Sequence, residues 1–102
     1  KVELFEKVQE LLNYKDEINK VIEIMITWYR DLLLLNLDQE DKIINADYLE
    51  QLKKNLAKFE VAEIEKTIEI LEESNELIKN YNVNLQLSLE VMFLKVKRIR
   101  RF

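Results

Sequence analysis

Apolar residues recur every three or four positions in five stretches of the chain, which is the spacing of one face of an α-helix. These stretches predict helices from about Val2 to Asn13, from Asp16 to about Leu35, from Asn45 or Asp47 along a stripe that reaches Phe59, from Val61 to about Lys79, and from Asn82 or Asn84 to about Arg98. Short connections favour antiparallel neighbours, so we expect one compact, all-α five-helix bundle. The sequence has no Gly and no Pro, the usual punctuation of sheets, and this disfavours a sheet-rich fold.

The second and fifth predicted helices carry more apolar residues than one face can hold. The fifth has Leu85, Leu89, Met92, Val96 and Ile99 on one face and Leu87, Val91 and Leu94 on another. Surplus apolar surface on a small domain is typical of a partner site, and aromatic side chains often dominate binding there. Trp28, Tyr29, Phe93 and Leu94 are therefore candidate subunit-interface residues. The alternative is that they are buried within the domain.

One charged pair, Arg30 and Asp31, interrupts the apolar second helix. The apolar run around it is too short to span a bilayer, and both charges would lie at its middle, so we expect no membrane segment. Adjacent residues diverge by about 100° on a helix, so each charge should reach a different neighbour. We propose Glu90, the only acid in the fifth helix, as the buried partner of Arg30. The alternative is that both charges reach solvent at a helix edge.

Several polar residues stand where helix caps are needed. Asp47, with Glu50 three residues later, fits a capping box for the third helix, and Asn82 or Asn84 is expected to cap the fifth. Asp16 is placed to cap the second helix. In the absence of Gly, Asn should supply the left-handed positions after helix ends, and the candidates are Asn13, Asn36 and Asn80.

Composition excludes much chemistry. At 102 residues the chain is the size of a single domain, residues 1–102. It has no Cys and no His, which removes thiol catalysis, the usual zinc sites and the commonest general base. It has no Gly-rich phosphate loop, and the glutamates of the fourth helix fan over a solvent face instead of converging. We therefore expect no catalytic residue, metal or cofactor in this chain.

Charge is unevenly placed. All 20 acidic residues lie at or before Glu90, and the last turns carry Lys95, Lys97, Arg98, Arg100 and Arg101. This basic end fits the cation bias of a helix C-terminus, a contact with DNA or an acidic partner, or a contact with anionic lipid. An acidic body argues against DNA wrapping around the domain.

Two segments resemble the C-terminal collar domain of bacterial DNA polymerase III clamp-loader subunits, most closely delta-prime, with gamma/tau next. They are Trp28-Tyr29-Arg30-Asp31-Leu32-Leu33-Leu34-Leu35 and Asn82-Val83-Asn84-Leu85-Gln86-Leu87-Ser88-Leu89-Glu90. The resemblance covers nearly the whole chain in its helix order. The Asn-Val-Asn segment and a chain that ends just after the fifth helix favour delta-prime.

The resemblance implies a non-catalytic collar, in which five such domains from delta, delta-prime and gamma/tau form a ring. That ring holds together the machine that loads the sliding clamp, and DNA and clamp are contacted only through the parent complex. The start at Lys1 without Met suggests a C-terminal fragment, and the lack of a signal peptide fits a cytoplasmic protein. The alternative function is a helical nucleic-acid-binding or adaptor module that uses the basic end.

Overall fold

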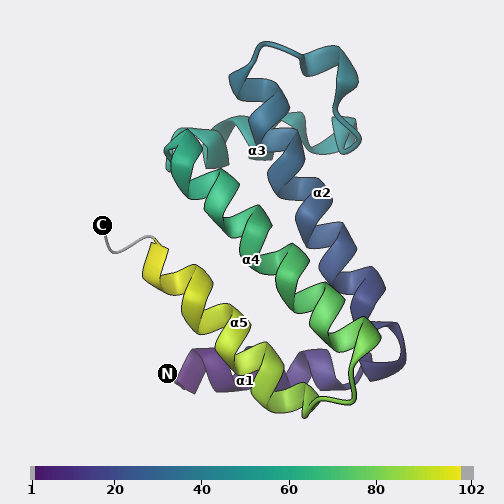
Figure 1. Cartoon of the computed structure of the whole chain (residues 1–102). Coiled ribbons are helices and arrows are strands. Elements are labelled where there is room, and N and C mark those ends of the chain that lie inside the picture. Colours follow the sequence, from purple (N-terminus) through teal and green to yellow (C-terminus); the bar gives the residue numbers. More distant parts are fainter. Residues whose placement is uncertain (1, 100–102) are drawn as a thin grey trace.

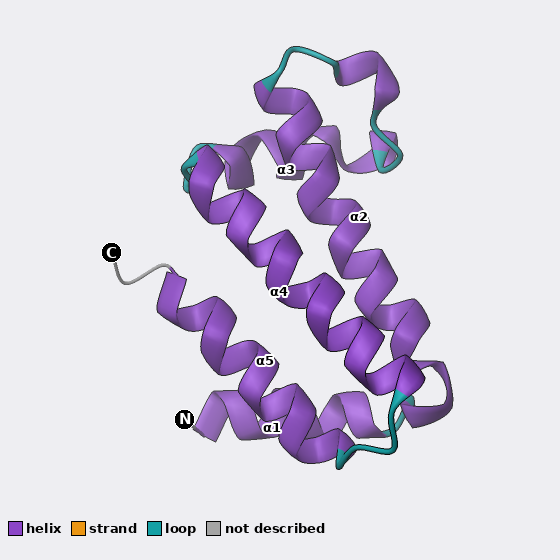
Figure 2. Ribbon diagram, viewed as in Figure 1, coloured by secondary structure: helices purple, strands orange, loops and turns teal. Residues whose placement is uncertain are grey.

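The structure is a computed structural model that describes the backbone of residues 2–99 and their side chains except those of residues 2, 3 and 5, so the predicted core position Phe5 lies outside the described side chains. Five α-helices and three short 3₁₀ turns make up the described elements, and no strand occurs among them (Figure 2). The helices are α1 (Val2–Leu12), α2 (Ile18–Asn36), α3 (Leu49–Leu56), α4 (Val61–Asn80) and α5 (Leu85–Ile99). The predicted all-α five-helix bundle is confirmed.

α4 lies between two neighbours (Figure 1). It packs along the length of α2 on one side and against α5 on the other. α1 crosses beneath the bundle against α5, and α3 packs against the C-terminal half of α2. Because α2 and α5 flank α4, their outward faces point to different sides of the domain.

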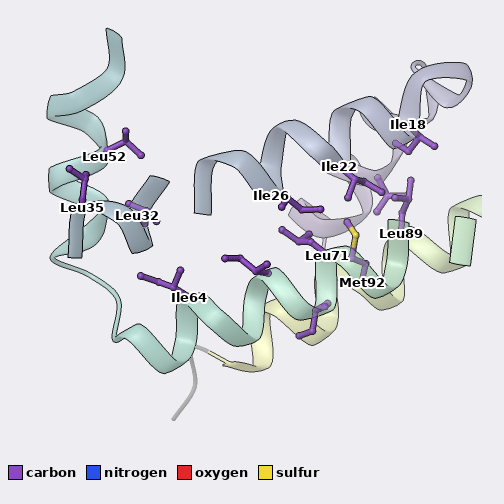
Figure 3. Close-up of a cluster of buried hydrophobic side chains, with 13 residues drawn as sticks. Ile18, Ile22, Ile26, Leu32, Leu35, Leu52, Ile64, Leu71, Leu89 and Met92 are labelled. Atoms are coloured by element: carbon purple, nitrogen blue, oxygen red, sulfur yellow. The ribbon is translucent and has the colours of Figure 1, made fainter. Parts of the chain in front are cut away.

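The core runs the length of the α2–α4 pair (Figure 3). At one end Ile22 of α2 and Leu71 of α4 meet Leu89 and Met92 of α5, and at the other end Leu52 of α3 packs near Leu32. All of these side chains are fully buried. Burial of apolar surface at about 25 cal/mol per Å² is the main stabilisation of such a bundle, so these residues hold the five helices together.

α2 is apolar on most of its faces but is not enclosed on all of them. Ile24 is 68 % exposed in the middle of the helix, whereas Ile22 and Ile26 are buried. The apolar surplus expected of this helix is therefore partly exposed.

The end of α2 is set by Asp38, which has a φ of 58°. Its N–H donates to the carbonyl oxygen of Leu35 at 3.1 Å, and the next N–H, of Gln39, donates to that of Leu34 at 2.8 Å. These two bonds are the Schellman motif, which needs a left-handed residue directly after the helix. The expectation that Asn36 would be that residue is wrong, and Asn13 and Asn80 also have no positive φ, because Asp38 is the only positive-φ residue between residues 2 and 99.

The helix caps follow the predictions only at α5. Oδ1 of Asn84 accepts a hydrogen bond from the N–H of Leu87 at 2.9 Å, so Asn84, and not Asn82, caps this helix. The predicted caps Asp47 and Asp16 are wrong: each lies inside a 3₁₀ turn (Ala46–Tyr48 and Lys15–Glu17), and α3 and α2 begin at Leu49 and Ile18 without a side-chain cap. A 3₁₀ turn that leads into a helix moves the helix start past the capping side chain.

Candidate subunit interface

The four candidate interface residues do not form one surface. Trp28 lies towards the end of α2 near α3, partly buried, with its ring edge-on to Tyr48 at 6.3 Å between centroids. Tyr48 is itself largely exposed, so the two rings cover the segment that connects α2 to α3. Trp28 therefore packs first within its own domain.

Tyr29 and Phe93 are brought together across the bundle. Both are partly buried against the core, and both line a hollow of about 400 Å³ between α1, α2, α4 and α5. Tyr29 also packs edge-on against Phe59 at 5.9 Å between ring centroids. Two of the four candidate interface residues therefore lie together, but in a hollow whose floor is the hydrophobic core and not on a protruding surface.

Leu94 belongs to a different surface. It is 41 % exposed on α5, and Leu87 and Val91, seven and three residues earlier on the same face, are 56 % and 40 % exposed. Leu77, on the neighbouring α4, is 44 % exposed. This stripe of exposed aliphatic residues is the surplus apolar face expected of α5. The sequence pattern predicts Leu87, Val91 and Leu94 on one face of this helix, but nothing local in the sequence links Leu77 of α4 to that face.

Asp31 is the buried member of the charged pair. It is 1 % exposed, and its carboxylate accepts hydrogen bonds from the N–H of Ile44 at 3.0 Å, the N–H of Asn45 at 2.9 Å and Nδ2 of Asn45 at 2.8 Å. A buried carboxylate needs such donors because it has lost its water. Asp31 thus fixes the connection between α2 and α3.

The predicted buried pair of Arg30 with Glu90 is wrong. Arg30 is exposed, and its Nη2 atom lies 2.7 Å from Oε2 of Glu72 on α4. Glu90 instead accepts a hydrogen bond from Nε2 of Gln86, one turn earlier on α5, at 3.4 Å. Arg30 lies on the side of α2 that faces α4, so it meets Glu72 and not Glu90. The two charges of the pair do reach different neighbours, as the helix geometry requires.

The basic end of α5 is solvent-facing where it is described. Lys95, Lys97 and Arg98 are exposed, whereas Arg100 and Arg101 lie outside the described residues. Lys95 and Arg98 border a hollow whose other wall is α4 with Glu63 and Glu73. Acidic side chains opposite these cations oppose the approach of a phosphate backbone.

The described residues also lack two features that would point to other functions. No group of three or more acidic, His or Cys side chains is placed to hold a metal ion among them. Over the same residues, no helix has the length and apolar character needed to cross a bilayer.

Comparison with protein families gives one match, and it covers almost the whole chain. Residues 3–98 match the family described as DNA polymerase III, delta subunit, C terminal. Comparison with curated proteins gave no match, and neither did comparison with solved structures. Because this match covers far more than half of the chain, the chain belongs to the C-terminal domain family of the DNA polymerase III delta subunit, a component of the clamp loader.

Proposed function

We propose that this domain is the collar of a delta-prime-like clamp-loader subunit. It holds that subunit to gamma/tau and delta in a pentameric ring, and it performs no catalysis itself. DNA and the sliding clamp are then contacted by the assembled loader, in the cytoplasm, and not by this domain.

The observation that supports this proposal best is apolar surface on two sides of the bundle. Leu87, Val91 and Leu94 are exposed on α5, and Ile24 is exposed on α2, with α4 between the two helices. A subunit in a ring contacts one neighbour with one face and the other neighbour with a different face. An isolated domain gains nothing from exposed aliphatic side chains on both flanks.

The delta-prime assignment depends on the Asn82-Val83-Asn84 segment. Asn84 caps α5, so the segment fixes where the helix with the exposed aliphatic stripe begins. This is a local packing role that a delta-prime collar and a gamma/tau collar could share. The choice between the two is therefore part of the proposal.

The test is assembly of the loader with and without the domain. The subunit that carries it is co-expressed with gamma/tau and delta, and the mass of the complex is measured by light scattering. Deletion of the domain should release the subunit from the complex. A complex of unchanged mass after the deletion would refute the proposal.

DNA binding by the basic end of α5 is the second candidate function, favoured by the exposure of Lys95, Lys97 and Arg98. Binding through these cations would weaken with salt, with a log–log slope of about 0.9 per phosphate neutralised on duplex DNA. Fluorescence anisotropy of labelled duplex DNA at low salt tests it. Binding that is lost on removal of the end of α5 would support it, and no binding at low salt would dismiss it.

A further inference from the structure

A continuous groove runs along the outside of the α4–α5 pair. Two hollows, of about 620 Å³ and 230 Å³, lie between these helices. Glu73 of α4 and Lys95 of α5 line both of them, so the hollows are two parts of one groove. α4 and α5 lie side by side in Figure 1, and the groove follows the line between them.

The groove has the length of a helix. Its α4 wall extends from Ala62 to Leu77. At 1.5 Å per residue these positions are about 22 Å apart, which is about four turns of a packed helix. Side chains that line it recur every three or four positions on both helices, so it is bounded by two parallel ridges, the shape into which the ridge of a third helix packs.

One half of the groove is apolar. Leu77 from α4 faces Leu87 and Val91 from α5, and the remaining side chains there are Ser74, Ser88 and the shared pair Glu73 and Lys95. All three aliphatic residues are at least 40 % exposed. Covering them would remove apolar area from water, the main gain in helix-to-groove association.

The other half has an apolar floor between walls of opposite charge. Ile70 and Ile99 lie at the floor, Lys95 and Arg98 stand on the α5 wall, and Glu63 and Glu73 stand on the α4 wall. Lys66 is also on the α4 wall but is engaged at 3.2 Å with Glu69. Across residues 2–99, Lys95, Arg98 and Glu73 take part in no ion pair, so their charges are available to a partner.

We infer that this groove binds one amphipathic α-helix of a neighbouring clamp-loader subunit. The bound helix has an apolar stripe of about four turns that covers Leu77, Leu87, Val91 and Ile99. Over the charged half it carries Lys or Arg on the edge that faces α4 and Asp or Glu on the edge that faces α5. This inference rests on the proposed function and adds to it the position and chemistry of one of the two neighbour contacts.

The first experiment measures assembly of the subunit that carries this domain with the other loader subunits. Leu87→Glu combined with Val91→Glu should weaken association at least 10-fold, because buried anchors dominate an interface. Tyr14→Glu combined with Ile44→Glu is the matched control, since it places the same two charges on apolar side chains that are 57 % and 76 % exposed and lie outside the groove. Circular dichroism melts of each variant must show an intact fold.

The second experiment exchanges the charges on the two walls of the groove. The double variant Glu73→Lys with Lys95→Glu keeps the net charge and the apolar residues but exchanges the signs across the groove. It should weaken association several-fold, and the loss should shrink at high salt because screening reduces charge repulsion. Unchanged association of both this variant and the Leu87–Val91 variant would overturn the inference.

The third experiment identifies the occupant with a photo-crosslinking amino acid at position 91. A crosslink to a neighbouring subunit, within a helical segment of the described charge pattern, supports the inference. A crosslink to a second copy of this chain, to DNA or to a non-helical segment overturns it. If deletion of the domain leaves the loader intact, the proposed function fails; if deletion dissolves the loader but the groove variants assemble normally, only the groove assignment fails.

Discussion

Asp31 holds Asn45 by two hydrogen bonds, one from the backbone N–H at 2.9 Å and one from the side-chain Nδ2 at 2.8 Å. The same carboxylate accepts a third bond from the N–H of Ile44. These bonds close the loop that begins at the Schellman turn of Asp38 and ends in the 3₁₀ turn of residues 46–48. Trp28, one turn earlier on α2, packs on Tyr48 at the end of the same loop. The charged residue in the apolar helix is thus an anchor for irregular backbone.

Replacing Asp31 is expected to destabilise the domain strongly. Asp31→Ala should lower the free energy of unfolding by about 3 kcal/mol, because hydrogen bonds to a charged group contribute about 1.5–3 kcal/mol and the donors lose their acceptor. Urea unfolding followed by circular dichroism measures the change. Asp41→Ala, an exposed carboxylate in the same loop, is the control and should change stability by less than about 0.5 kcal/mol. Equal midpoints for the two variants would contradict the anchoring role.

Asp38 predicts a pair of substitutions with opposite effects. Its φ of 58° suits Gly better than any residue with a Cβ, so Asp38→Gly should leave stability unchanged or raise it slightly. Asp38→Val should lower stability by about 1–2 kcal/mol, because a β-branched side chain is strained in the left-handed region. Thermal melts of the two variants test the ordering. A Val variant as stable as the Gly variant would mean that α2 does not end in the Schellman turn.

Burial on α4 and α5 predicts that two leucines respond differently to truncation. Leu71 is fully buried, so Leu71→Ala should cost about 2–5 kcal/mol through lost burial and a cavity. Leu87 is 56 % exposed in the groove, so Leu87→Ala should cost less than about 1 kcal/mol in the isolated domain. Chemical denaturation gives both values. A large loss for Leu87→Ala would show that this side chain serves the domain's own core and not a partner.

The difference between local and long-range order explains what could be predicted from the sequence. Helices follow from contacts three and four residues apart, so their number and their approximate bounds were recoverable from periodicity. The fifth helix has two apolar faces, and the position of α4 determines which of them is buried. The local sequence pattern does not contain that position. Leu89 and Met92 are buried while Leu87 and Val91 are exposed for this reason.

The partners of the charged residues Arg30 and Asp31 could not be predicted for the same reason. Asp31 binds backbone donors 13 and 14 residues away, and backbone groups carry no signature in a sequence. The fifth helix offers one acidic side chain as a possible partner of Arg30, and α4 offers several. Only the packing of α2 on α4 determines that the partner is Glu72. The cap of α5 is one of the two predicted residues, because capping acts over three residues, whereas the caps predicted at Asp16 and Asp47 failed because a 3₁₀ turn precedes each helix.

A double-mutant cycle tests the corrected partner of Arg30. The coupling free energy between Arg30→Ala and Glu72→Ala should be about 0.2–1 kcal/mol, the range of an exposed ion pair, and should fall at high salt. The matched cycle of Arg30→Ala with Glu90→Ala should give a coupling near zero, because Glu90 is engaged with Gln86 and not with Arg30. Thermal or urea unfolding of the single and double variants supplies both couplings. Coupling to Glu90 that exceeds coupling to Glu72 would contradict the observed packing, in which Arg30 lies on the side of α2 that faces α4.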